Sequence, residues 1–323
     1  MITFAGIELK NPLVAASSPL TESLRRLECC RDAGFGAAIL KSAAPYDPAD
    51  TRLSSHQRKV VPSGRGYCAD GSFKSEIMPL EKAVALYKAA LPATEGMFLI
   101  PSLYVCAVEP EPWLEACCRF EEAGAKLIQL DFFYLGSVVR ETGFARRLRT
   151  LLRELTAGLK STVMPKLNPR FDPEGICRLM AENGVEQVSL LDSIRARRTH
   201  VVMLNRTLRP SPRLHPPLTS RFGPHQFPLT LEYLAAAKRH GLLVCAGGGA
   251  DTPHDFAELR ERGAELVQTA SFVLRNGYVS VASLLESLGE PAPLSADPAS
   301  LTHHTWCDIE ETGLCSGCGG CKV

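Results

Sequence analysis

The feature that most constrains the fold of this chain is a recurring pattern in which an amphipathic segment ends at a glycine and a short apolar run follows. The pattern occurs at residues 33–42, 123–131, 183–191, 240–248 and 262–270. Glycine suits the C-terminal cap of a helix because it adopts positive φ without strain. Runs that are apolar throughout, with no polar alternation, are typical of strands buried on both faces. We therefore expect helices that alternate with the strands of a parallel sheet.

Three further apolar runs bring the number of predicted strands to eight, and helical patterns lie between the strands. The additional runs are 12–17, 97–105 and 162–167, and the clearest helical patterns are 79–91, 110–124 and 172–184. Eight parallel strands with right-handed crossovers close naturally into a barrel, so we predict an α/β fold of the (β/α)8 TIM-barrel class. An open doubly wound sheet is the alternative. It is less favoured because no G-x-G-x-x-G turn follows the first strand.

Several segments depart from a bare barrel. Residues 2–12 read as an N-terminal hairpin that closes the bottom of the barrel. The Pro-, Arg- and His-rich stretch 194–228 is too long for a routine loop, and we interpret it as a lid. The predicted organisation is a barrel over 1–288, a linker over 289–306 and a short cysteine-rich metal-binding tail over 307–323.

Charge and length restrict the class of partner. The chain has 323 residues, with 36 Lys and Arg against 35 Asp and Glu. This balance gives no reason to expect a nucleic acid or an anionic membrane as partner, and it favours a small-molecule substrate. The apolar runs at the N-terminus are too short for a signal peptide or a membrane span, so we expect a cytoplasmic protein.

Polar residues follow the predicted strands where the loops of a barrel converge on one mouth. Those after the early and middle strands are Ser17, Lys41, Ser42, Asp131, Lys166, Asp192 and Ser193. A lysine within an apolar run is costly to bury unless it meets an anion or pairs with a carboxylate. The last two strands end in glycines and small residues, which suggests backbone amides that approach a phosphate.

The order of several motifs resembles the dihydroorotate dehydrogenase family, class 1, and is similar to the flavin domain of dihydropyrimidine dehydrogenase. The resemblance spans about residues 2–288 and is strongest in the first two and last two strands. The motifs that carry it are NPLVAAS (11–17), AAILKS (37–42), IQLD (128–131), MPKL (164–167), SLLDS (189–193), AGGGADTPHDFAEL (246–259) and GAELVQTAS (263–271).

This resemblance implies bound FMN, with the site residues assigned by position. Lys41 reaches the edge of the isoalloxazine, and Lys166 supports the pyrimidine end, where negative charge accumulates on reduction. The other implied cofactor-binding residues are Ala16 and Ser17 beside the flavin, Ser193 after the sixth strand, and Gly248, Gly249, Ala270 and Ser271 at the phosphate. The family has Gly-Thr where this chain has Ala270-Ser271. Members of the family often dimerise, which implies a homodimer.

The family pattern breaks after the fourth strand, where the family carries its Cys or Ser base. Tyr134 occupies the base position here, and Asp131, Gly136 and Asp192 replace expected asparagines. An ionised carboxylate only accepts hydrogen bonds, so two acids favour a substrate that bears donors. Alternatively, one acid pairs with an arginine of the lid, or the two acids shift each other's pKa and supply a general base.

Two residues are candidates for the missing base. Tyr134 is one, although a phenol normally titrates near pH 10, and a stacking or structural role is the alternative. Cys68, in the glycine-rich loop after the second strand, is the other, with an inert thiol as the alternative. The predicted catalytic set is therefore Lys41, Asp131, Tyr134, Asp192 and Cys68.

The tail carries a metal-site pattern, C-x7-C-x2-C-x2-C, formed by Cys307, Cys315, Cys318 and Cys321. The compact C-x2-C-x2-C resembles the ferredoxin-type ligands of a [4Fe–4S] cluster. The alternatives are four-cysteine zinc, a redox-active thiol tail, or thiols that bind no metal. The cysteines within predicted helices read as small core residues. They are Cys29, Cys30, Cys117, Cys118 and Cys177.

Taken together, these features predict an FMN-dependent oxidoreductase with a [4Fe–4S] cluster. Its substrate would be a small nitrogen-containing molecule, oxidised or reduced at a C–C or C–N bond. Without a nicotinamide fingerprint, we expect one-electron exchange with a ferredoxin-like partner. One alternative is an authentic dihydroorotate or dihydropyrimidine dehydrogenase with a displaced base. Another is a non-catalytic flavin and iron–sulfur subunit for electron transfer or assembly.

Overall fold

The computed structural model describes most of the chain from the N-terminus to residue 292. The described residues are 1–45, 59–63, 66–70, 78–105, 107–132, 135, 139, 141–191, 194–196 and 219–292. For 59–63, 66–70, 194–196 and 219–222 the description covers the backbone.

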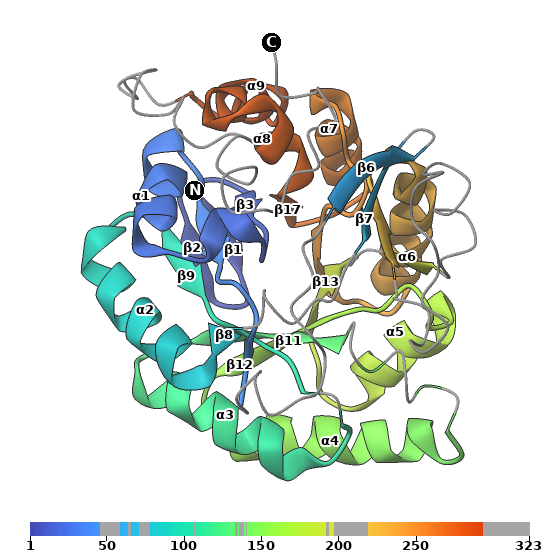
Figure 1. Cartoon of the computed structure of the whole chain (residues 1–323). Coiled ribbons are helices and arrows are strands. Elements are labelled where there is room, and N and C mark those ends of the chain that lie inside the picture. Colours follow the sequence, from blue (N-terminus) through green and yellow to red (C-terminus); the bar gives the residue numbers. More distant parts are fainter. Residues whose placement is uncertain are drawn as a thin grey trace, which may run out of the picture.

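A curled parallel sheet forms the centre of the molecule (Figure 1). Its main strands are β3 (Leu13–Ala15), β4 (Ala37–Ile39), β9 (Phe98–Ile100), β10 (Ser102–Leu103), β11 (Leu127–Asp131), β12 (Thr162–Lys166), β13 (Gln187–Leu190), β16 (Leu243–Ala246) and β17 (Leu266–Thr269). Pro101 alone separates β9, which pairs with β4, from β10, which pairs with β11. The pairing continues from β11 to β17, and β17 pairs with β3. This order is consistent with the predicted TIM-like barrel.

Two short strands extend the sheet at the edge formed by β10. β5 (Ala43–Ala44) pairs with β10, and β8 (Met78–Pro79) pairs with β5.

Helices cover the outside of the sheet (Figure 1). They are α1 (Leu24–Ala33), α2 (Leu80–Ala93), α3 (Pro110–Glu122), α4 (Phe144–Gly158), α5 (Pro173–Glu182), α6 (Phe227–Arg239), α7 (Pro253–Glu261), α8 (Ser271–Asn276) and α9 (Val281–Ser287). The glycines of the recurring pattern all have positive φ, as expected after a helix. At Gly34, for example, φ is 102° and the amide donates to the Arg31 and Cys30 carbonyls at the end of α1. The helix–glycine–strand prediction is therefore confirmed.

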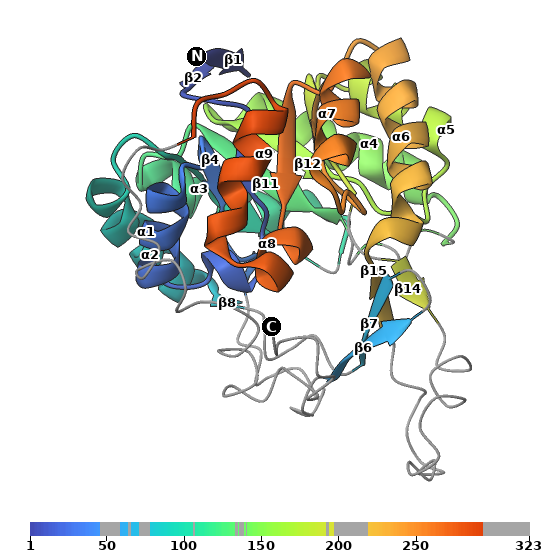
Figure 2. The ribbon, with the colours of Figure 1, turned by 90° about the horizontal axis from the view of Figure 1, so that it is seen from above.

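The N-terminal hairpin closes the end of the barrel at which the strands begin. β1 (Ile2–Phe4) pairs antiparallel with β2 (Ile7–Leu9). Phe4 and Leu9 are buried in one apolar cluster with interior residues of the strands, among them Leu127. The hairpin lies at one end of the barrel in Figure 2, so the predicted N-terminal hairpin is present.

The helical cysteines contribute to the core between helices and sheet, as predicted. Cys30, Cys117 and Cys177 are fully buried free thiols, Cys29 is nearly buried, and Cys118 is half-buried. Burial raises the pKa of the Cys177 thiol to about 12. A thiol that stays protonated packs as a small hydrophobe, in agreement with a structural role.

Two long insertions combine into a second, antiparallel sheet. β6 (Lys59–Ser63) and β7 (Gly66–Asp70) come from the insertion after β5, and β14 (Ile194–Ala196) and β15 (Thr219–Phe222) from the insertion after β13. The order is β14–β15–β7–β6, and Figure 2 shows this sheet at the end of the barrel opposite the hairpin.

The predicted lid boundary at residue 228 is wrong. A 3-10 helix, η5 (Pro224–Gln226), and the first turn of α6 already occupy 224–228.

Among the residues that the structure describes, no helix combines the length and apolar character needed to cross a membrane.

Candidate active site at the carboxyl ends of the strands

On β11, β12 and β17 the interior of the barrel changes from apolar to polar over two residues. Side chains two residues apart on a strand share a face. Leu127, Met164 and Leu266 belong to the apolar cluster beneath the hairpin, and the residues two positions later are Gln129, Lys166 and Gln268. These three polar residues are 0%, 8% and 4% exposed. The barrel therefore holds a buried polar layer between its apolar floor and the strand ends.

Ser42 is the centre of a hydrogen-bond network in this layer. Its hydroxyl donates to Oδ2 of Asp131 at 3.0 Å and lies 2.9 Å from the Ser102 hydroxyl. The Ser17 hydroxyl lies 3.2 Å from the Ser42 hydroxyl and accepts a 3.1 Å bond from the Ser42 amide. Gln129 Nε2 donates to the Ser102 hydroxyl at 2.9 Å. Residues from four parts of the chain, Asp131 included, are thus joined in one network.

Lys166 lies beside Asp131 in the sheet. The two residues are partners in the parallel register of β11 and β12, and Lys166 is also the register partner of Ser189 on β13. The Lys166 ammonium acts on Cys245, because it lowers the pKa of that thiol while the larger effect of burial raises it. Lys166 and Asp131 are therefore adjacent at the carboxyl ends of β11 and β12.

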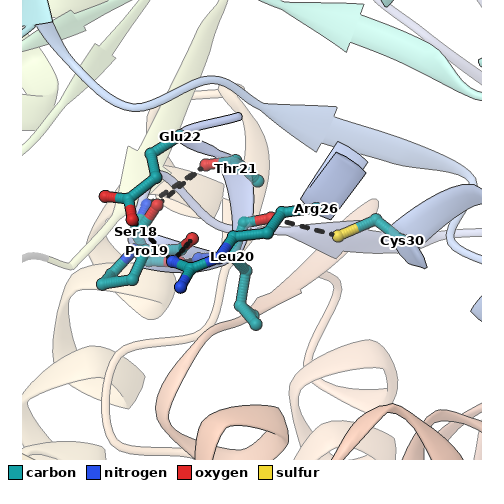
Figure 3. A network of polar contacts seen from close by, with 7 residues as sticks. All are labelled: Ser18, Pro19, Leu20, Thr21, Glu22, Arg26 and Cys30. Carbon is teal, nitrogen blue, oxygen red and sulfur yellow. Dashed lines mark hydrogen bonds and ion pairs between the residues drawn. The ribbon is translucent and has the colours of Figure 1, made fainter. Parts of the chain in front are cut away.

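The loop after β3, which contains Ser17, is fixed by a network of its own (Figure 3). Ser18 caps the 3-10 helix η1 (Pro19–Thr21), since its hydroxyl accepts from the Leu20 amide at 3.2 Å while its amide donates to the Thr21 hydroxyl. Arg26 of α1 donates to the Pro19 carbonyl and to Glu22, both at 2.6 Å.

Two contacts extend this network to neighbouring elements. The Cys30 thiol of α1 donates to the Leu20 carbonyl at 3.5 Å. The Thr21 carbonyl accepts the Lys41 amide at 3.2 Å. The backbones that carry Ser17 and Lys41 are therefore linked.

The glycines after β16 are required by close packing. A Cβ atom at Gly248 would lie 2.9 Å from the Leu191 carbonyl and from two side chains. A Cβ at Gly249, where φ is +86°, would lie 2.4 Å from the Phe227 amide nitrogen. These backbones pack against the start of α6. Gly248 and Gly249 are thus required for packing, and their role in phosphate binding stays a prediction.

Most of the predicted site residues that the structure describes gather at this end of the barrel. Asp131 and Lys166 belong to the polar layer described above, the Ser17 hydroxyl contacts Ser42 within it, and Lys41 directly precedes Ser42. Ala16, Gly248, Gly249, Ala270 and Ser271 follow the adjacent strands β3, β16 and β17, where the Ala16 amide donates to the Thr269 carbonyl at 2.9 Å.

For the other predicted site residues the structure does not describe a side-chain position. Cys68 lies on β7, where its backbone is the register partner of Arg221 on β15. Tyr134, Gly136, Asp192, Ser193, Cys307, Cys315, Cys318 and Cys321 lie outside the described residues. Within the described part of the chain, no group of three or more His, Cys, Asp or Glu residues could hold a metal ion.

Three residues of the polar layer were not predicted: Ser102, Gln129 and Gln268. Gln268 Nε2 donates to the Ser189 hydroxyl at 2.8 Å and to the Leu190 and Cys245 carbonyls at 2.9 and 3.3 Å. The signal for all three is a polar residue inside an otherwise apolar strand.

A scan of the sequence against models of known protein families finds no model that matches.

Proposed function

We propose that this protein is an FMN-dependent oxidoreductase of the dihydroorotate dehydrogenase type. The observation that carries the proposal is the meeting of the buried Lys166, the half-buried Lys41 and the glycine-rich end of β16 at one mouth of a TIM-like barrel. Barrel enzymes place their sites at this end of the strands, and a buried cation favours an anionic ligand.

The polar layer fits a ligand that bears both donors and negative charge. Gln129 and Gln268 are buried, and within the described residues their side-chain oxygens accept no hydrogen bond. A buried amide oxygen without a donor is costly, so a ligand N–H that reached this layer would be favoured there. Lys166 and Lys41 supply positive charge beside these acceptors.

When bound, FMN would supply transfer of a hydride or of single electrons. In the proposed arrangement Lys41 and Lys166 contact the ring, and Gly248, Gly249, Ala270 and Ser271 hold the phosphate, with Ala16, Ser17 and Ser193 lining the site. Lys166 would stabilise the negative charge that develops on reduction.

Asp131 faces the substrate in this proposal. It would accept hydrogen bonds or a proton from a small nitrogen-containing molecule that is oxidised or reduced at a C–C or C–N bond. Asp192, Tyr134 and Cys68 complete the proposed substrate and proton-handling groups. A small-molecule substrate agrees with the balanced charge of the chain.

Cys307, Cys315, Cys318 and Cys321 are proposed to bind a [4Fe–4S] cluster, because thiolates at these spacings suit iron–sulfur ligation. A cluster would allow one-electron exchange with a ferredoxin-like partner. The alternative, structural zinc in the same cysteines, would restrict the protein to hydride exchange with a diffusible partner.

An anaerobic absorption spectrum of the purified protein, with iron and zinc analysis, tests both cofactors. Flavin bands together with a broad band near 400 nm that bleaches with dithionite would support the proposal. Flavin with zinc and without iron would assign the tail a structural role. Absence of flavin after reconstitution with FMN would overturn the proposed function.

Steady-state turnover with candidate cyclic amines and dihydropyrimidines, using an artificial electron acceptor, separates an enzyme from a non-catalytic subunit. Turnover of dihydroorotate or a dihydropyrimidine at the highest rate would favour the authentic dehydrogenase. A flavin that is never reduced by any of these compounds would favour an electron-transfer or assembly subunit.

A further inference from the structure

The contact between Ser42 and Asp131 joins two residues that are 89 positions apart in the sequence. Both side chains are buried, with Ser42 6% and Asp131 4% exposed. We propose that Ser42 is a positioning residue, whose hydroxyl fixes the orientation of the Asp131 carboxylate and favours its ionised form. The consequence for a substrate rests on the proposed function, whereas the contact itself does not.

The network determines which way the Ser42 proton points. A serine hydroxyl has one proton to donate and two lone pairs that accept. Asp131 Oδ2 accepts this proton, because an ionised carboxylate has none of its own to donate. In the contacts with Ser17 and Ser102, where geometry alone allows either hydroxyl to donate, the Ser42 oxygen is therefore the acceptor.

A neutral donor stabilises a carboxylate without cancelling its charge. Hydrogen bonds to the charged form of an acid favour that form. The titratable groups on the strands packed against β11 at this end are Tyr104, which follows β10, and Lys166 on β12, and Lys41 precedes Ser42 directly. Ser42 therefore adds a fixed, pH-independent donor to a carboxylate whose neighbour in the sheet is Lys166.

The arrangement also narrows the proposed class of substrate to molecules that present an N–H group to Asp131. A carboxylate that is held ionised and in one orientation accepts hydrogen bonds and donates none. A substrate N–H group is its complement, whereas a carbonyl oxygen at the same place would be repelled. Ser42 would in this way select for N–H against C=O at the position that Asp131 contacts.

The test is the titration of Asp131 in the full-length protein as purified. Carbon-13 labelling of aspartate carboxyl groups gives a signal for each Asp, and the signal lost in Asp131→Asn identifies Asp131. In Ser42→Ala we expect the titration midpoint of Asp131 to rise by about one pH unit, the typical contribution of a hydrogen bond to a charged group. Ser42→Thr keeps the hydroxyl and should restore the wild-type midpoint.

A matched control distinguishes positioning from general loosening. Ser161 is also buried, and its hydroxyl donates to the Ala125 carbonyl at 2.6 Å, at the start of β12 and away from the strand ends. Ser161→Ala should destabilise the fold without moving the Asp131 midpoint. An unchanged midpoint in folded Ser42→Ala, or an equal shift in Ser161→Ala, would overturn the proposal.

A second variant covers the case in which Ser42→Ala does not fold. Ser102→Ala removes one of the two hydroxyls in contact with the Ser42 oxygen and so weakens the donor that Ser42 offers to Asp131. A smaller upward shift is expected, and no shift would contradict the proposed chain. The measurement needs no flavin. Its failure is therefore distinct from a failure to bind FMN in the spectroscopic test.

Discussion

Asp131 and Lys166 are register partners at the carboxyl ends of β11 and β12, so an acid and a cation occupy adjacent positions at the centre of the candidate site. Neighbouring strands lie about 4.8 Å apart, and both residues are buried. At this separation and burial each charge affects the other, and each would act on a bound anionic ring in the opposite sense.

The first prediction concerns the reduction potential of bound FMN. Lys166→Met should lower the potential, because the reduced ring carries negative charge that the ammonium stabilises. We expect a change on the order of 30 mV, which equals about 1.4 kcal/mol for a two-electron couple. A potentiometric titration with dithionite and redox dyes measures the shift.

Asp131→Asn is the matched counterpart, since it removes the opposing charge with little change in shape and should raise the potential. Lys166→Arg keeps the positive charge and should stay close to wild type. Shifts of the same sign in Lys166→Met and Asp131→Asn would contradict the assignment of opposed roles.

The curled parallel sheet and its helices could be predicted from the sequence because the strands and caps are encoded locally. Each strand is a continuous apolar run, and glycines such as Gly34 and Gly124 stand where a helix must end with positive φ. Lysines and acids at strand ends were recognisable because charged residues are conspicuous after apolar runs.

The hydrogen-bond network was not predictable from such local signals. Ser102 reads as a minor interruption of an apolar run, and its partners Ser42 and Gln129 are 60 and 27 residues away. Only the register of the strands brings them together. The small antiparallel sheet was missed for a similar reason, since β7 pairs with β15 from an insertion about 150 residues further along the chain, as the partners Cys68 and Arg221 show.

The second prediction tests the packing of the glycines after β16. Gly249→Ala places a Cβ 2.4 Å from the Phe227 amide nitrogen, at a φ of +86°. Backbone strain alone costs roughly 1 kcal/mol, so the added clash should bring the loss of stability in urea unfolding to about 3 kcal/mol or more. The FMN dissociation constant, measured by flavin fluorescence, should rise as well.

Gly241 provides the control for this variant. Its φ is +73°, and a Cβ there would meet nothing within 4 Å. Gly241→Ala should therefore cost only the strain, roughly 1 kcal/mol, with FMN binding unchanged. Equal losses in the two variants would show that the contact with α6 contributes nothing.

The third prediction concerns the Gln268 amide, which donates to the Ser189 hydroxyl and to two backbone carbonyls. Gln268→Glu replaces donors with a carboxylate that faces the same acceptors. Gln268→Met keeps the approximate volume and removes all polar contacts, which should cost about 1–3 kcal/mol. We expect Gln268→Glu to lose more, because its charge would also be buried. Thermal and urea unfolding of both variants checks the order, and a Gln268→Met variant as stable as the wild type would show that Gln268 merely fills space.

The last prediction is a pH dependence of stability that originates at Cys177 on α5. Burial raises the pKa of this thiol from the usual 9.0 to about 12. A raised pKa in the folded state means that the stabilisation is complete below pH 9 and is lost as the pH rises towards 12, because the unfolded chain releases the proton first. Between pH 8 and pH 10 the share of Cys177 in that loss is about 1.4 kcal/mol.

Cys177→Ala removes this titration and leaves a small cavity whose cost does not depend on pH. The free energy of unfolding in urea should therefore fall less between pH 8 and pH 10 in Cys177→Ala than in the wild type. Ile176→Ala, next to it on α5 and also buried, is the control with no titratable group, and it should lower stability equally at both pH values. An identical fall in wild type and Cys177→Ala would mean that the thiol ionises in the folded protein as easily as in the unfolded chain, and that water reaches it through the packed face of α5.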